Sequence, residues 1–133
     1  MAKKNPYSVP HKVLIGEAAG EGETGMWHVA SVMHNRVNKK RPSLDHVVNE
    51  PFQFSARARK DLDAFVGKQT PEVHAAAERA MARAATERAT DATHYMTSKL
   101  YGSAKRPSWA GKMDVAGVIG NHTFLRERKA KRK

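Results

Sequence analysis

Apolar side chains recur at helical spacing through the first two thirds of the chain. Ser8 can cap a helix that begins at Val9 and ends near residues 19–21, with Val13 and Glu17 on the face of Val9. Residues 20–25 are polar and rich in glycine, which predicts a loop. The clearest helix follows, because one apolar stripe at i, i+3, i+4, i+7 and i+11 consists of Met26, Val29, Ala30, Met33 and Val37.

Shorter signals divide the remainder of the chain. Ser43 can cap a short helix through Val48, a further short helix is expected over residues 57–66, and Thr70-Pro71 starts the longest helix, over 71–89. Residues 93–97 predict a short strand, residues 98–114 a loop, and residues 115–125 a hairpin around Gly120-Asn121. Helices that precede a small β part near the C-terminus predict an α+β, mostly helical single domain.

Length and composition agree with one folded domain. The chain has 133 residues, of which 40% are hydrophobic. We expect a flexible arm over residues 1–7, the folded domain over 8–125 and a basic tail over 126–133. The absence of cysteine excludes disulfides, thiolate nucleophiles and cysteine–metal sites. No apolar run near the start reaches the roughly 7–15 residues of a signal-peptide core. We therefore expect no signal peptide, and a protein that stays in the host cytoplasm until it is released.

The net charge of +11 is the strongest global feature of the chain. A surface of this kind attracts polyanions such as nucleic acid, anionic lipid headgroups or the acidic polymers of a bacterial envelope. The segment 126–133 alone contains six cations and one anion. It is either a solvated tail or an electrostatic tether.

Several kinds of active site are excluded because their motifs are missing. The chain has no Walker loop, dinucleotide fingerprint, HExxH or GxSxG sequence. Its histidines lack metal-ligand spacing; His28 and His34, for example, are six residues apart and would lie on opposite sides of a helix. We therefore expect neither a metal nor a cofactor.

Glu17 is the first candidate for acid–base chemistry. It ends the apolar face of the first helix, where burial disfavours a charged carboxylate and favours the protonated form that a general acid requires. Glu21 lies four residues further on, and Glu23 follows in the predicted loop. The alternative is that Glu17 only caps the next helix or pairs with an arginine.

Aromatic, amide and imidazole side chains provide candidates for a sugar-binding cleft, because aromatic faces stack on pyranose rings and amides bond to N-acetyl groups. The candidates are Gln53, Tyr95, Trp109, Asn121 and His122. Trp109 is the strongest of them because its neighbours are small and polar. Phe54 and Phe124 are better explained as core residues.

Five short motifs occur in a familiar order. They are Ile15-Gly-Glu-Ala-Ala-Gly-Glu21 followed by Gly25-x-x-x-Val-Ala-x-Val-x-x-Asn-Arg-Val37, then Gln53-Phe54-Ser55, Asp91-Ala-Thr-His-Tyr95, Pro107-Ser-Trp109 and Ile119-Gly-Asn-His-Thr-Phe124. This series resembles the spore-cortex-lytic type of cell-wall hydrolase over residues 12–125. The chain departs from the family pattern at Ala19, where an arginine is usual, at Met26-Trp27, and in a shorter segment after Asp91.

The resemblance implies a lysozyme-like fold and cleavage of the MurNAc–GlcNAc β-1,4 bond of peptidoglycan, with Glu17 as the family's catalytic acid. We expect a lytic transglycosylase with one catalytic glutamate, acting as a phage lysis or virion-associated enzyme. One alternative is a hydrolytic muramidase of bacterial origin, with Glu21, Glu23 or Asp45 as a second carboxylate. The others are a binding module without catalysis and a basic nucleic-acid-binding protein.

The expected partners follow from this interpretation. They are the glycan strands of peptidoglycan and, through the basic tail, an anionic outer-membrane surface. We expect a monomer that binds no nucleic acid, because the arginines of the longest predicted helix alternate with glutamates instead of forming a basic stripe.

Overall fold

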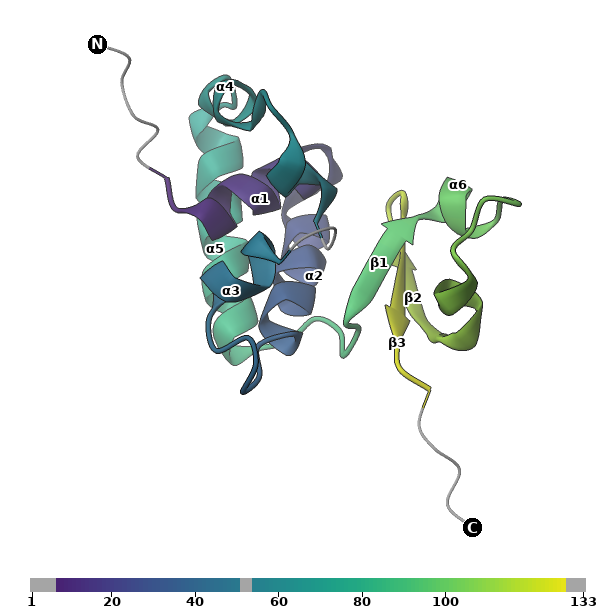
Figure 1. Ribbon diagram of the computed structural model, residues 1–133. Helices are drawn as coiled ribbons and strands as arrows, with labels where there is room; N and C mark the ends of the chain where they lie inside the picture. Colours follow the sequence, from purple (N-terminus) through teal and green to yellow (C-terminus); the bar gives the residue numbers. More distant parts are fainter. Residues whose placement is uncertain (1–6, 51–53, 129–133) are drawn as a thin grey trace.

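The computed structural model describes residues 7–50 and 54–128 of the chain. The helices are α1 (Val9–Ala18), α2 (Gly22–Asn35), α3 (Leu44–Asn49), α4 (Leu62–Gly67), α5 (Pro71–Thr86) and α6 (Ser98–Tyr101). The 3-10 turns are η1 (Ala19–Glu21), η2 (Ser55–Ala58) and η3 (Ser108–Lys112), and the strands are β1 (His94–Thr97), β2 (Asp114–Ile119) and β3 (His122–Arg126). Helices α1–α5 form one group, and the sheet with α6 lies beside it (Figure 1).

Helix α1 occupies the centre of the helical group. Its N-cap is Ser8, as predicted, because the Ser8 hydroxyl accepts a hydrogen bond from the His11 backbone N–H at 3.3 Å. The consecutive residues Val13, Leu14 and Ile15 are all fully buried. Since consecutive residues point in different directions, α1 is covered nearly all round, by α2, α3, α4 and α5. Its last turn carries Glu17.

Helix α2 begins earlier than the sequence predicts, so the expected loop over residues 20–25 is wrong. Gly22 has a φ of 77° and makes the corner between η1 and α2, which is why a side chain is disfavoured there. Gly25 allows η1 to fold back on α2, because a Cβ at Gly25 would lie 2.5 Å from the Cβ of Glu21. Gly22 and Gly25 therefore permit a tight turn between η1 and α2, not an extended loop.

Other element boundaries agree with the sequence or differ locally. Thr70 caps α5 at the predicted position, although the helix ends at Thr86 and not at residue 89. The expected helix over 57–66 is divided into η2 and α4, and the expected loop over 98–114 contains α6 and η3. Helix α6 forms because the Thr97 hydroxyl accepts a hydrogen bond from the Leu100 backbone N–H at 3.2 Å.

The sheet is antiparallel with the strand order β1-β3-β2, so the last strand in sequence is the central one. The hairpin β2–β3 turns at Gly120, as predicted, and Tyr95 of β1 pairs with Phe124 of β3. Phe124 packs in the main core, whereas Met96 and Leu125 belong to a second small core on the other face. This architecture confirms the predicted α+β, mostly helical class. Within the described residues, no helix is long and apolar enough to cross a membrane.

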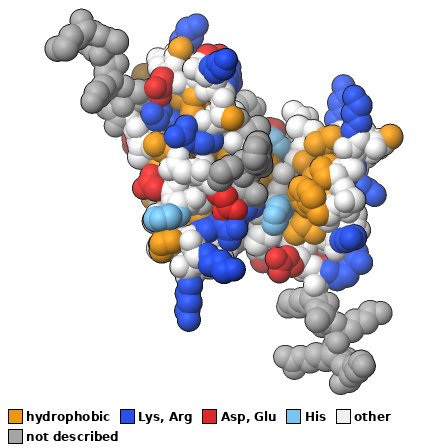
Figure 2. All heavy atoms as spheres, in the orientation of Figure 1, with side chains coloured by type: hydrophobic (Ala, Val, Ile, Leu, Met, Phe, Trp, Pro, Cys, Tyr) orange, Lys and Arg blue, Asp and Glu red, His pale blue; other side chains and the backbone are white. Residues whose placement is uncertain are grey.

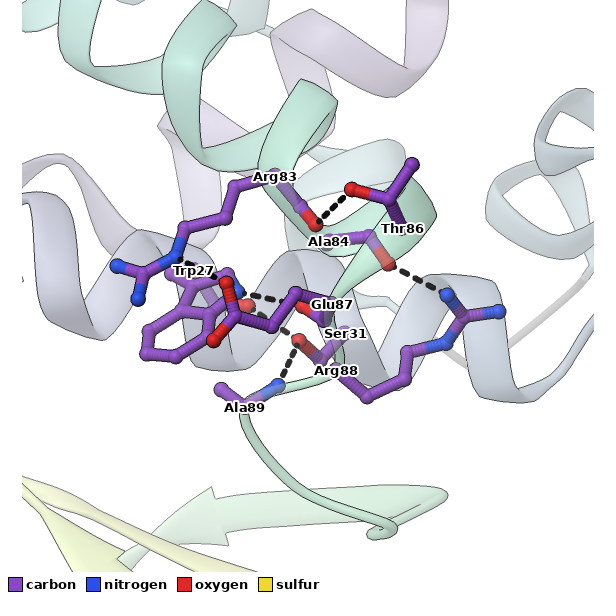
Figure 3. A network of polar contacts seen from close by, with 8 residues as sticks. All are labelled: Trp27, Ser31, Arg83, Ala84, Thr86, Glu87, Arg88 and Ala89. Carbon is purple, nitrogen blue, oxygen red and sulfur yellow. Dashed lines mark hydrogen bonds and ion pairs between the residues drawn. The ribbon is translucent and has the colours of Figure 1, made fainter.

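One face of α2 binds the backbone of the segment that follows α5 (Figure 3). The Trp27 indole N–H donates to the Glu87 carbonyl at 2.9 Å, and the Arg83 guanidinium lies 3.6 Å from the centroid of the Trp27 ring. One turn further along α2, the Ser31 hydroxyl accepts a hydrogen bond from the Ala89 N–H at 2.9 Å. The chain is thus fastened to α2 as soon as it leaves α5.

The same face continues through the end of α2 to the start of β1. The Asn35 side-chain amide donates to the carbonyls of Thr90 and Ala92, both at 2.8 Å. Arg36 then donates to the Thr93 carbonyl at 3.1 Å. Trp27, Ser31 and Asn35 are spaced by four residues, so one helix face fixes where β1 begins.

A stack of three rings joins the beginning of the described chain to α5. The ring of Tyr7 lies on those of His11 and His74, with centroids 4.6 Å and 4.2 Å away. The His74 Nε2–H donates to the Val66 carbonyl at 3.0 Å, so His74 Nδ1 accepts from His11 Nε2, also at 3.0 Å. Tyr7, the last residue of the expected flexible arm, is therefore packed against the helical group.

Candidate active site

A cleft of 1240 Å³ separates the helical group from the sheet. Its lining includes Glu17, Arg36 and Arg57 from the helical side and Tyr95, Trp109 and His122 from the other side. Hydrophobic side chains gather over the β part in the space-filling view (Figure 2). Residues far apart in the sequence therefore face one another across this cleft.

The two oxygens of the Glu17 carboxyl group are held from different elements. Oε2 accepts a hydrogen bond from the backbone N–H of Ala56 in η2 at 2.9 Å. Oε1 accepts a hydrogen bond from the Tyr95 hydroxyl of β1. Because the donors approach separate oxygens, they fix both the position and the plane of the partly buried carboxyl group.

Gly16 explains how η2 comes close enough to Glu17. A Cβ at this position would lie 2.7 Å from the Cβ of Ala56 and 2.8 Å from Cδ1 of Leu62. Both contacts are far shorter than a normal carbon–carbon contact of about 3.5–4.0 Å. The absent side chain at residue 16 therefore allows the hydrogen bond between Ala56 and the neighbouring Glu17.

Tyr95 is a dependable hydrogen-bond donor. Burial, followed by the charge and hydrogen bond of Glu17, raises the pKa of Tyr95 well above its ordinary value. The phenol is therefore protonated across the physiological range. Phe124 and His122 pack around it, with ring centroids 5.5 Å and 5.3 Å from that of Tyr95.

Glu21 does not line the cleft but contacts a residue that does. Its Oε1 pairs with His122 Nδ1 at 2.9 Å, and a Cβ at Gly120 would lie 2.4 Å from its Oε2. Glu21 therefore joins the corner of α2 to the β2–β3 turn. Asn121, at the tip of this turn, is exposed, and its carbonyl accepts a hydrogen bond from the Ser98 N–H at 2.8 Å.

The other residues that the sequence analysis considered for sugar binding lie in different surroundings. Trp109 lines the cleft and is 43% exposed, and its ring centroid lies 5.1 Å from that of His94. Gln53 lies outside the described residues. Phe54 and Phe124 are buried in the core, as the sequence analysis expects.

The further carboxylates considered as partners of Glu17 lie elsewhere. Glu23 pairs with Arg79 at the surface at 2.7 Å, and Asp45 is exposed in the first turn of α3. Neither is part of the cleft lining. Within residues 7–50 and 54–128, no three histidine or acidic side chains group as they would around a metal ion.

Three charged residues of the cleft, Arg36, Glu50 and Arg57, have no role in the sequence-based interpretation. The pKa of Arg36 is lowered by burial, and its guanidinium lies 5.8 Å from the centroid of the Phe54 ring. Glu50 accepts a hydrogen bond from Arg41 Nη2 at 2.7 Å, and this hydrogen bonding lowers the pKa of Glu50. Arg57 donates a hydrogen bond to the side chain of Asn49. Of the three, only Arg36 belongs to a motif identified in the sequence, as the arginine of the Asn-Arg pair in the second predicted helix.

The sequence and the fold agree on the family. A family model described as cell wall hydrolase matches residues 20–125. The chain belongs to the cell wall hydrolase family, a class of enzymes. Glu17 lies just before the matched range, so its assignment depends on its place in the cleft. No protein of curated function matches the chain.

Two solved structures share this fold. The catalytic domain of the germination-specific lytic transglycosylase SleB from Bacillus anthracis has a TM-score of 0.61 and 23% identity, over 93% of this chain and 100% of that chain. The catalytic domain of the Bacillus cereus SleB protein has a TM-score of 0.60 and 25% identity, over 92% of this chain and 94% of that chain. With the family match, they confirm the predicted fold class and the resemblance to spore-cortex-lytic enzymes.

Proposed function

We propose that this enzyme cleaves the β-1,4 bond between MurNAc and GlcNAc in peptidoglycan, as a lytic transglycosylase with Glu17 as its catalytic residue. The observation that carries the proposal is the Glu17 carboxyl group in the cleft, held by Ala56 from one wall and Tyr95 from the other. The cell wall hydrolase family supports the substrate, and the lytic transglycosylase among the similar structures supports the reaction.

The reaction requires one carboxyl group used twice. Glu17 gives its proton to the bridging oxygen as the bond from that oxygen to C1 of MurNAc breaks, which leaves an oxocarbenium-like centre at C1. The 6-hydroxyl of the same MurNAc then forms a bond to C1, and its proton passes to the Glu17 carboxylate. The product is a 1,6-anhydro end, and the enzyme recovers its original protonation.

The surroundings of Glu17 support the route with one carboxyl group. Among the described residues, Glu50 is the only other acidic residue that lines the cleft, and its carboxylate is engaged by Arg41. A hydrolytic muramidase would need a second carboxylate near C1 to act as a base or nucleophile. Glu50 is the candidate for that role, so hydrolysis is the alternative reaction.

Replacement of Glu17 by glutamine tests the assignment. Glu17→Gln keeps the shape of the side chain but removes the proton donor, so turnover on purified peptidoglycan should fall by about 10²–10⁴-fold. Glu23→Gln is the matched control, because Glu23 carries the same group outside the cleft. Wild-type turnover in a folded Glu17→Gln protein would refute the assignment.

The products distinguish the two reactions. Mass spectrometry of the released muropeptides should detect 1,6-anhydro-MurNAc ends if the 6-hydroxyl attacks C1. Reducing MurNAc ends would instead identify a hydrolytic muramidase. If the protein releases no muropeptide and binds duplex DNA tightly, the nucleic-acid-binding alternative replaces both.

The biological role we propose is lysis, by a phage or virion-borne enzyme whose basic tail binds an anionic outer membrane. The net charge of +11 supports attraction to an anionic surface. Two cations of the expected tail are paired with the domain, since Arg126 contacts Asp91 and Arg128 contacts Asp114. The remaining four cations, all beyond residue 128, would supply the tether.

A further inference from the structure

The two walls of the cleft offer different chemistry to a glycan strand. The wall on the β side contributes the apolar and aromatic side chains of Leu100, Pro107 and Trp109 to the cleft lining. The wall on the helical side carries guanidinium groups, among them Arg57. A strand in this cleft would therefore meet a stacking surface on one flank and positive charge on the other.

Arg57 is hydrogen-bonded to a neutral side chain, whereas neighbouring arginines pair with carboxylates. Its Nε donates to the Asn49 side-chain oxygen at 2.6 Å, and Asn49 is neutral. By contrast, Arg59 pairs with Asp61, and Arg41 pairs with Glu50. Over residues 7–50 and 54–128, no carboxylate lies within ion-pair distance of Arg57. The Asn49 amide therefore orients this guanidinium without neutralising its charge.

Arg57 also lies next to the catalytic contact. It follows Ala56, whose N–H holds the Glu17 carboxyl group, and both belong to the same turn, η2. The Nε–H is used by Asn49, and within residues 7–50 and 54–128 no hydrogen bond engages the two terminal nitrogens, which suit a bidentate interaction. A planar acceptor bound there would belong to a sugar at or beside the cleaved bond.

The ionised groups on a peptidoglycan strand that match a guanidinium are carboxylates, and they lie on the lactyl side of MurNAc. They are the lactyl carboxylate itself on strands without a stem peptide, and the carboxylates of the stem peptide where one is attached. Arginine pairs with carboxylates in a planar fork and strengthens such a contact by its charge.

We propose that Arg57 binds a carboxylate on the lactyl side of MurNAc and makes the enzyme selective for strands that keep this charge. This inference rests on the proposed function. Binding by Arg57 would orient the glycan strand in the cleft, with the lactyl substituent toward η2 and a sugar face toward Trp109. The charge on Arg57 thus becomes a determinant of specificity, separate from the chemistry of Glu17.

The experiment compares native peptidoglycan with the same material after its carboxyl groups have been converted to methylamides. On the native substrate, Arg57→Gln should lower kcat/KM by about tenfold to a hundredfold, chiefly through KM, because a charged hydrogen bond is lost. On the capped substrate, Arg57→Gln and the wild type should be equally active. Lys60→Gln is the control, since it removes one exposed cation close by that does not line the cleft.

Each result has a defined meaning. An equal loss on native and capped material would show that Arg57 contacts the sugar itself, and no loss on any substrate, amidase-treated strands included, would show that it contacts nothing; both overturn the inference. Strands freed of stem peptides by an amidase identify the source, because the amidase exposes the lactyl carboxylate. The Arg57 effect appears or grows on these strands if the lactyl carboxylate is bound, and it disappears if a stem carboxylate is bound. A wild type that releases no muropeptide from native material would instead refute the proposed function.

Discussion

Gly16→Ala is a test of the close approach that supports Glu17. The added methyl group would meet the Ala56 Cβ at 2.7 Å, and relief to a contact of about 3.5 Å requires η2 to withdraw by about 0.8 Å. The same movement would lengthen the bond from the Ala56 N–H to Glu17 Oε2, now 2.9 Å, to about 3.7 Å, which is no longer a hydrogen bond. Loss of this hydrogen bond should lower kcat by about tenfold or more, because it holds the catalytic carboxyl group in position.

The stability of the same variant follows from two opposing effects. Alanine favours a helix over glycine by about 1 kcal/mol, whereas overpacking costs about 1–3 kcal/mol. We therefore expect a net loss of up to about 2 kcal/mol, measured by chemical denaturation, together with the loss of turnover measured on purified peptidoglycan.

Gly67→Ala is the matched control for Gly16→Ala. Gly67 ends α4, and a Cβ there would meet no atom within 4 Å. This variant should be as active as the wild type and no less stable. If Gly16→Ala also retained wild-type turnover and stability, η2 could adjust without leaving Glu17, and the reasoning would be refuted.

The remaining predictions concern pH, the cleft wall and the tail. Burial, followed by the charge of His74, lowers the pKa of His11 in the folded protein. As the pH drops below about 6.5, His11 is therefore protonated more readily in the unfolded chain than in the folded one, and the free energy of unfolding should fall by up to about 1.4 kcal/mol per pH unit. His11→Gln should flatten this slope in thermal melts. Trp109→Ala should raise KM while leaving the melting temperature within a few degrees, because this residue is 43% exposed; a large loss of stability with unchanged KM would mean that Trp109 is structural. Removal of residues 129–133 should leave cleavage of purified peptidoglycan intact but weaken binding to anionic vesicles by about 1 kcal/mol per lost cation, an effect that should shrink as salt rises. Unchanged vesicle binding would contradict the tether.

Elements with local signals were predictable from the sequence. Ser8 and Thr70 provide side-chain caps, and Gly120 supplies the positive φ of the hairpin turn, so each can be recognised within a few residues. The start of α2 could not be predicted in this way. It has no side-chain cap, and Gly25 is required by contact with Glu21, a packing effect that a helix signal does not encode.

The candidate site was predictable where side-chain chemistry defines it. Glu17, Tyr95 and Trp109 were selected as an acid and as aromatic residues, and the fold brings them to one cleft. The contribution of Ala56 was not predictable, because every residue except proline has a backbone N–H and the identity of this one carries no information. The significance of Arg57 depends on which arginines are paired, and that emerges only from the folded chain.

The order of strands in the sheet has a consequence for biosynthesis. Since β3 lies between β1 and β2, neither outer strand has a neighbour to pair with until β3 has been made. On the ribosome, a growing chain would contain Glu17 first and Tyr95 later, and both would be made before the strand that pairs with β1. Nascent chains should therefore be inactive until β3 has left the exit tunnel.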